Sequence, residues 1–151
     1  MKRIVDITQY MSEELVALDV NVQTGPEVIE YLAELAKQAE AVPDAGQLNQ
    51  ALTEREKLGS TGVGHGLAIP HVHIETSRIT VAFLRTTEGI DFGAIDGNPS
   101  QLFFLVISSK TEKMPYLNVL AAIATKAKHR DVLEKLQTAP TPEEVLAILK
   151  G

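Results

Sequence analysis

The stretch QLFFLVISS (residues 101–109) is almost wholly apolar, which is typical of a central β-strand buried on both faces of its sheet. The stretch RITVAFLRT (residues 78–86) has the same character, because its apolar side chains alternate between the two faces of a strand. One face carries Ile79, Val81 and Phe83, and the other carries Ala82 and Leu84. Two strands covered on both sides predict helices on both faces of the sheet.

Helical patterns flank these strands along the chain, and two further stretches resemble strands. The expected helices cover residues 6–11, 25–39, 43–59, 114–128, 130–139 and 141–151. Their expected caps are Asp6, Thr24 and Asp44 in the first three, and a capping box of Thr141 and Glu144 in the last. The further strands are expected over residues 14–22 and 66–71, and residues 87–100 form a turn-rich connection.

The order of these elements predicts an α/β fold in a single domain over residues 1–151. We expect a three-layer sandwich, in which a mixed, mostly buried sheet of about five strands is flanked by helices on both faces. In the helix over residues 114–128, the expected apolar face consists of Leu117, Leu120, Ala121 and Ala124.

Composition narrows the classes of function. The net charge of −6 disfavours a nucleic-acid partner, because such proteins need a basic face. The absence of cysteine excludes disulfides, thiolate metal sites and a thiol nucleophile, and it suits the cytoplasm. The stretch MKRIVDITQYMSEE turns acidic before any long apolar run, so no secretory signal is expected, and no apolar run is long enough to span a membrane. We therefore expect a cytoplasmic protein.

Three of the four histidines lie in GSTGVGHGLAIPHVHIE (residues 59–75). A metal site is one interpretation, since His71 and His73 point the same way if the strand continues, with His65 or Glu75 as a third ligand. The spacing matches no strong metal-binding pattern, so this interpretation is disfavoured. His73 is expected to lie beyond the strand end as an ordinary solvated side chain, and so is His129.

The surroundings of the other two histidines favour phosphate chemistry. The glycines let the backbone approach a ligand closely, the hydroxyls and amides offer an anion-binding concavity, and Arg55 offers a forked donor. The expected phosphate loop consists of Ser60, Thr61, Gly62, Gly64 and Gly66. Pro70 fixes the chain just before His71. A plain glycine-rich turn between a helix and a strand is an equally weighted alternative.

The stretch TEREKLGSTGVGHGLAIPH (residues 53–71) closely resembles the signature of a bacterial family. That family comprises the enzyme IIA domains of the phosphoenolpyruvate-dependent sugar phosphotransferase system, in the fructose–mannitol–nitrogen class. GIDFGAIDGNPSQLFFLVISS (residues 89–109) is similar to the family's second landmark, an acidic-glycine turn that leads into a central apolar strand. The resemblance covers nearly the whole chain and implies the fold of that family.

The resemblance implies a mechanism as well. In the family, the histidine after the proline takes a phosphoryl group from the carrier protein HPr, and sugar transporters pass it to a cysteine of a IIB domain. Carried over, the acceptor is His71, and Arg55 stabilises the charge of the phosphoryl group. Neutral imidazole is available as a nucleophile near pH 7 because its ordinary pKa is about 6.5. Neither a metal nor another cofactor is implied.

Two positions depart from the family pattern. His65 stands where the family usually has asparagine, and Tyr116, which precedes Leu117, stands where it often has a second histidine. One interpretation is drift without consequence. Another is compensation, in which His65 and the Tyr116 hydroxyl are supporting donors beside the phosphoryl group. A third is an impaired site in a protein that only binds partners.

The predicted function is therefore a phosphocarrier, a transferase component if it is active. It accepts a phosphoryl group from an HPr-type protein on His71 and passes it to a IIB component on another polypeptide during sugar uptake. The alternative is a regulatory protein of the nitrogen-branch type, in which the phosphorylation state of His71 controls binding to a transporter or regulator. A remote alternative is a metal hydrolase that uses the histidine cluster. No nucleic-acid partner is expected, and contact with a membrane is expected only through permease partners.

Overall fold

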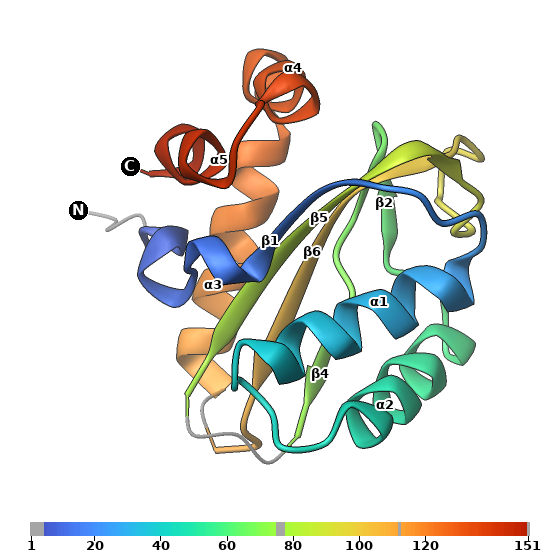
Figure 1. Cartoon of the computed structure of the whole chain (residues 1–151), viewed down its shortest axis with the longest axis vertical. Helices are drawn as coiled ribbons and strands as arrows, with labels where there is room; N and C mark the ends of the chain where they lie inside the picture. Colours follow the sequence, from blue (N-terminus) through green and yellow to red (C-terminus); the bar gives the residue numbers. More distant parts are fainter. Residues whose placement is uncertain (1–4, 75–77, 112, 151) are drawn as a thin grey trace.

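The computed structural model describes residues 5–74, 78–111 and 113–150, and it consists of a six-stranded sheet between two layers of helices (Figure 1). The strands are β1 (Val16–Val20), β2 (Gly62–Gly64), β3 (Leu67–Ala68), β4 (His71–His73), β5 (Thr80–Ile90) and β6 (Ser100–Ser108). The α-helices are α1 (Gly25–Gln38), α2 (Ala45–Lys57), α3 (Lys113–Ala127), α4 (Arg130–Thr138) and α5 (Pro142–Leu149). Two short 3₁₀ helices, η1 (Ile7–Tyr10) and η2 (Glu13–Leu15), precede β1.

The sheet is mixed, as predicted. Its strand order is β1-β5-β6-β3-β2, and β4 pairs with β6 as well. The central pair β5 and β6 is antiparallel, with Phe83 opposite Phe104, whereas β1 is parallel to β5. Both β3 and β4 run parallel to β6 and occupy successive parts of it, so that Ala68 lies opposite Phe103 and His71 opposite Val106.

Both faces of the central strands are buried, which confirms the three-layer prediction. On one face, Ala82 and Leu84 belong to a core that α1 and α2 cover. On the other face, Val81 and Phe83 belong to a core that is closed by η1, α3, α4 and α5. Figure 1 shows α1 and α2 on one side of the sheet and α3 on the other.

The predicted helix caps are confirmed. The Thr24 hydroxyl accepts a hydrogen bond from the Glu27 amide, and the Asp44 carboxylate accepts from the Gly46 amide. At the last helix, the Thr141 hydroxyl accepts from the Glu144 amide. Each cap satisfies an amide that lacks a partner inside its own helix.

Three local predictions were wrong. Strand β3 ends at Ala68, just before Pro70, but the Pro70 carbonyl accepts from Val106 and β4 then resumes the pairing with β6. His73 therefore lies in β4 and not in a loop. Strand β5 extends to Ile90, well into the stretch predicted as a connection.

The third error concerns the buried face of α3. The buried residues are Tyr116, Val119, Ala122 and Ile123, whereas Leu117 is 53% exposed. Two sets of apolar residues in this helix follow helical spacing, and packing against the sheet buries the set that differs from the predicted face.

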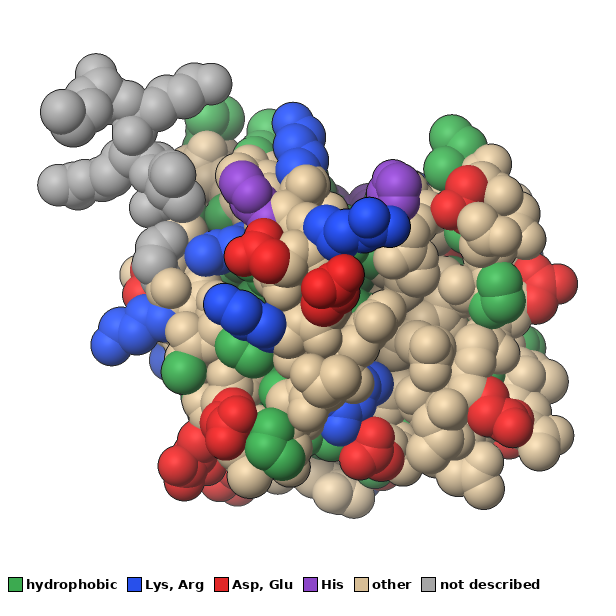
Figure 2. Space-filling view, turned by 90° about the horizontal axis from the view of Figure 1, so that it is seen from above, with side chains coloured by type: hydrophobic (Ala, Val, Ile, Leu, Met, Phe, Trp, Pro, Cys, Tyr) green, Lys and Arg blue, Asp and Glu red, His purple; other side chains and the backbone are tan. Residues whose placement is uncertain are grey.

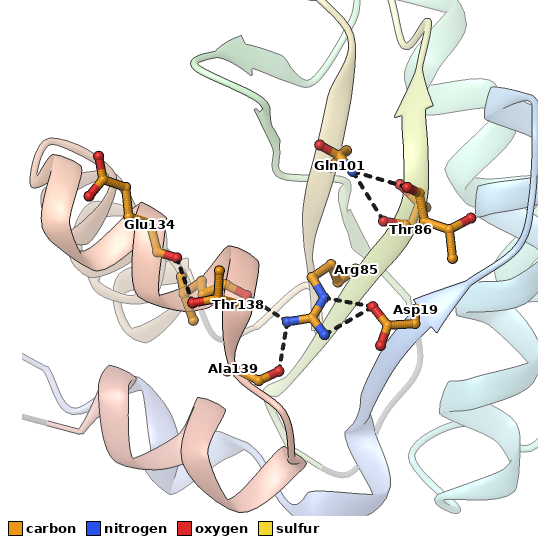
Figure 3. Close-up of polar contacts among 9 residues, drawn as sticks. Asp19, Arg85, Thr86, Gln101, Glu134, Thr138 and Ala139 are labelled. Carbon is orange, nitrogen blue, oxygen red and sulfur yellow. Dashed lines mark hydrogen bonds and ion pairs between the residues drawn. The ribbon is translucent and has the colours of Figure 1, made fainter.

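Arg85 links three elements in the interior (Figure 3). Its side chain lies in β5, donates to the carbonyls of Leu136 and Ala139 at 3.0 and 2.8 Å, and pairs with the Asp19 carboxylate at 3.0 Å. The two carbonyls belong to the end of α4 and the residue after it, and Asp19 belongs to β1. The guanidinium therefore satisfies carbonyls that a helix end leaves without partners. Within the described ranges, no helix is both long and apolar enough to cross a membrane.

Candidate functional site

His71 is the first residue of β4 and is half-buried. Its neighbour Val72 packs into the core beneath α1 and α2. Because side chains alternate along a strand, His71 and His73 point to the opposite face, where α3 lies. The Nδ1 atom of His71 lies 2.7 Å from the carbonyl oxygen of Ile69.

This contact determines which nitrogen of His71 can react. A carbonyl oxygen only accepts hydrogen bonds, so Nδ1 carries the proton and the neutral ring has a bare Nε2. Burial lowers the pKa of His71, while the bond to Ile69 raises it and the charge of Arg55 lowers it again. The ring is therefore held in its neutral form near pH 7, with the lone pair of Nε2 available as a nucleophile.

Tyr116 in the first turns of α3 brings a buried aromatic ring to the two histidines of β4. Its ring centroid lies 6.0 Å from that of His71 and 4.2 Å from that of His73. Burial raises the pKa of Tyr116 to about 12, so its hydroxyl keeps its proton at neutral pH. The position that departs from the family pattern thus lies beside the candidate acceptor.

Sequence reasoning missed His73. Its Nδ1 lies 2.8 Å from the Ser108 hydroxyl of β6, and its ring is the nearer of the two imidazoles to Tyr116. The available signal was the two-residue spacing from His71, which places both side chains on one face of a strand.

Arg55 in the last turn of α2 supplies positive charge to the site. Its Nη1 donates to the Gly59 carbonyl at 2.8 Å. Its charge lowers the pKa of both His71 and Tyr116, so it lies within electrostatic reach of both. The structure therefore brings together the rings of His71, Tyr116 and His73. The positive charge of Arg55 acts on His71 and Tyr116.

The hydroxyls of the expected phosphate loop are engaged inside the protein. The Thr61 amide and hydroxyl both donate to the Glu56 carboxylate, the hydroxyl at 2.6 Å. The Ser60 hydroxyl donates to the Phe92 carbonyl at 2.6 Å and accepts from the Gly62 amide at 2.9 Å. These bonds fasten the loop to α2 and to the connection between β5 and β6. Sequence reasoning missed Glu56 in this role, although it follows Arg55 within the signature stretch of residues 53–71.

His65 forms the tip of the hairpin between β2 and β3, flanked by Gly64 and Gly66. It adopts a left-handed conformation with φ 57°, and its amide donates to Asp96 at 3.0 Å. Asparagine and histidine both tolerate this conformation better than most residues, so the exchange of one for the other suits the backbone.

The His65 side chain lines a groove of about 780 Å³ together with residues that include Ala124, Lys128 and Arg130. Figure 2 views this end of the molecule, where histidine and basic side chains lie around a hollow. Ala124 is eight residues beyond Tyr116 in α3, which is about 12 Å along the helix axis. Between described residues, no hydrogen bond or ring contact joins His65 to His71. That His65 is a supporting donor for His71 stays a prediction, and the place of His65 in this groove does not favour it.

Metal binding gains no support from the described part of the chain. No three histidine or acidic side chains within it lie close enough together to hold a metal ion. Glu75, one of the third ligands considered above, lies outside the described residues.

Known proteins resemble this chain over nearly its whole length. The sequence model described as "Phosphoenolpyruvate-dependent sugar phosphotransferase system, EIIA 2" matches residues 9–151. The fructose-specific EIIA component of Haloferax volcanii is 37% identical over 147 residues, 97% of this chain and 96% of that protein. The crystal structure of nitrogen regulatory protein IIA-Ntr from Neisseria meningitidis superposes with a TM-score of 0.90 at 34% identity, covering 95% of this chain and 99% of that one. The mannitol enzyme IIA of Escherichia coli, solved in complex with phosphorylated enzyme IIB, has the same fold, with a TM-score of 0.76 at 24% identity over 91% of this chain and 95% of that one.

Proposed function

The chain belongs to the EIIA 2 family of phosphocarriers of the phosphoenolpyruvate-dependent sugar phosphotransferase system, and from that premise we propose that it is phosphorylated on Nε2 of His71. The observation that carries this proposal is the 2.7 Å hydrogen bond from His71 Nδ1 to the Ile69 carbonyl. It fixes the ring and leaves Nε2 as the nitrogen with a free lone pair.

The proposed transfer needs no proton to leave the nucleophile. The lone pair of Nε2 forms the new bond to phosphorus, and the nitrogen–phosphorus bond of the donor breaks with its electron pair staying on the donor. The phosphoryl group carries charge on its equatorial oxygens, so catalysis consists mainly of positioning and electrostatic stabilisation. Arg55 supplies positive charge, and the protonated Tyr116 hydroxyl supplies a hydrogen-bond donor on the side of α3.

The proposed donor is an HPr-type protein, and the proposed acceptor is the cysteine of a IIB component during sugar uptake. The Escherichia coli mannitol enzyme IIA, solved with phosphorylated IIB, offers a precedent for this route. The fructose-specific Haloferax protein is a relative that favours transport. We propose that these phosphoryl transfers take place in the cytoplasm, with membrane contact only through permease partners.

A regulatory role is the second candidate, because the Neisseria structure with a TM-score of 0.90 is a nitrogen regulatory protein. In that role the same phosphoryl group on His71 controls binding to a transporter or regulator. The two candidates share the acceptor histidine and differ in whether a IIB cysteine receives the phosphoryl group.

The test is phosphorylation with purified components. The protein is incubated with phosphoenolpyruvate, enzyme I and HPr, and intact mass is recorded before and after acid treatment. We expect an acid-labile phosphoryl adduct on the wild type and on His129→Ala, and none on His71→Ala. No adduct on the wild type, or an undiminished adduct on His71→Ala, would overturn the proposal. Adding a IIB component then separates the candidates, since only the transport role predicts loss of the adduct to IIB.

A further inference from the structure

His71 and His73 form a pair on one face of β4. They lie two residues apart, which separates them by about 7 Å along the strand. The side chain between them, Val72, packs on the opposite face of the sheet. Both imidazoles therefore project toward α3, from which Tyr116 reaches them.

The hydrogen bonds of β6 constrain His73 as well. The Ser108 hydroxyl has a single proton, and its oxygen lies 3.3 Å from the Ser109 carbonyl and 2.8 Å from His73 Nδ1. When that proton goes to the Ser109 carbonyl, His73 Nδ1 is the donor to Ser108 and a neutral His73 has a bare Nε2, as His71 does. Within the part of the chain that the structure describes, no hydrogen bond involves Nε2 of either ring.

The Tyr116 ring lies closer to His73 than to His71. The centroid separation of 4.2 Å between the rings of Tyr116 and His73 is that of a close aromatic contact, whereas the Tyr116 ring is 6.0 Å from that of His71. Because the bond to Ser108 orients the His73 ring, this contact constrains Tyr116 together with the core residues that bury it.

The two imidazoles also interact electrostatically. The charge of His73 is one of the causes that lower the pKa of His71, after burial and Arg55. Among the described residues, the ionisable groups that act on His71 and Tyr116 are Arg55 and Glu56 on α2 and His73 on β4. A negative phosphoryl group on His71 would reverse the sign of this coupling and favour a protonated His73.

We propose that His73 is a positioning residue for phosphoryl transfer, which holds the Tyr116 ring beside His71 and takes up a proton on Nε2 when the phosphoryl group arrives. The inference rests on the proposed function. The proton comes from the solvent and adds to the lone pair of Nε2, while the transfer itself moves no proton. The added positive charge offsets part of the negative charge on the phosphoryl oxygens.

Two substitutions separate the roles of the ring and of its nitrogens. His73→Phe keeps an aromatic ring against Tyr116 and removes both nitrogens, whereas His73→Ala removes the ring too. His129→Phe is the matched control, because His129 is exposed and makes no side-chain cap bond to α4. The initial rate of adduct formation is measured by intact mass over a range of concentrations of phosphorylated HPr, between about pH 6 and pH 8.

We expect His73→Phe to keep the KM for the donor and to lose maximal rate by about tenfold at the acidic end, because the positive charge that offsets the phosphoryl group is lost; a tenfold loss corresponds to about 1.4 kcal/mol. The difference from the wild type should shrink as the pH rises, because the wild-type His73 then stays neutral. His73→Ala should lose more rate at every pH, since Tyr116 also loses its support. His129→Phe should follow the wild type throughout.

The outcomes separate this inference from the proposed function. A wild type that forms no adduct refutes the proposed function, and the role of His73 falls with it. A wild type that forms the adduct while His73→Phe matches its rate at every pH refutes the role of His73 alone. Long-range ¹H–¹⁵N NMR of the unphosphorylated protein adds a check that needs no donor. We expect protonated Nδ1 in both rings, and a neutral His73 with its proton on Nε2 would overturn the inference.

Discussion

Replacing Arg85 by methionine tests how the end of α4 is anchored to the sheet. Methionine keeps much of the length and volume of arginine but donates no hydrogen bonds. The substitution therefore leaves the carbonyls of Leu136 and Ala139 without the donor that lies 3.0 and 2.8 Å away in the wild type. The residues that carry these carbonyls are 1% and 3% exposed, so water reaches them poorly.

The magnitude follows from these contacts. A buried acceptor left without its partner costs about 1–3 kcal/mol, so two of them predict a loss of about 4 kcal/mol in the free energy of unfolding. The ion pair contributes little, because the Asp19 side chain is 69% exposed and exposed pairs contribute about 0–1 kcal/mol. Asp19→Asn is the matched control. It removes the charge and suits the left-handed backbone of this residue, φ 53°.

The assay is urea denaturation followed by far-ultraviolet circular dichroism, with amide hydrogen exchange to locate the change. We expect Arg85→Met to lose about 4 kcal/mol and to exchange faster in α4, and Asp19→Asn to lose less than about 1 kcal/mol. A loss below about 1 kcal/mol in Arg85→Met would refute the carbonyl argument. Equal losses in the two variants would show that the ion pair carries the stability instead.

Three further perturbations test the site. First, an NMR titration should show His71 gaining charge only below the ordinary histidine value of about 6.5, since burial lowers its pKa. As the pH falls, the unfolded chain binds this proton at a higher pH than the folded protein does. The contribution of His71 to the free energy of unfolding is therefore full above the ordinary pKa and is lost as the pH falls through the lowered pKa. A titration midpoint of His71 above the ordinary value would contradict this. Second, Arg55→Gln should slow adduct formation on His71 by about tenfold or more while the thermal midpoint stays unchanged, and an unchanged rate would remove Arg55 from the mechanism. Third, Gly62→Ala should lower stability by about 1–3 kcal/mol in urea denaturation, because its Cβ would lie 2.8 Å from the Cα of Ala94; a variant as stable as the wild type would contradict the close approach.

The parts of the fold that the sequence predicts are those whose physical cause is local. Strands buried on both faces must be apolar throughout, so β5 and β6 stand out as runs of apolar residues. Helix caps lie within three residues of the amides they bind, so Thr24 and Thr141 are visible as well. Strand β4 is different, because its existence depends on pairing with β6, more than thirty residues away along the chain. The three residues His71–His73, taken alone, have no property that predicts a strand after Pro70.

The same distinction applies to the site. Pro70, the glycine-rich loop and the family resemblance all point to His71, whose role as acceptor stays a proposal. The engagement of Ser60 was not, since its partner Phe92 lies 32 residues away and becomes a neighbour only when the loop packs against the β5–β6 connection. The surroundings of His73 are not visible in the local sequence for a related reason: its partners Ser108 and Tyr116 come from β6 and α3.

The two departures from the family pattern differ in physical kind. His65 replaces asparagine at a left-handed position, φ 57°, and its bond to Asp96 uses a backbone amide that any residue except proline provides. Its side chain lines a groove at the opposite end of α3 from Tyr116, so this exchange preserves the hairpin without entering the site. Tyr116 replaces histidine in direct contact with the imidazoles of β4, so this exchange changes the chemistry of the site. His73 on β4 places a second imidazole beside Tyr116 and His71. Compensation for a histidine on α3 is therefore better sought on β4 than at the tip of the hairpin.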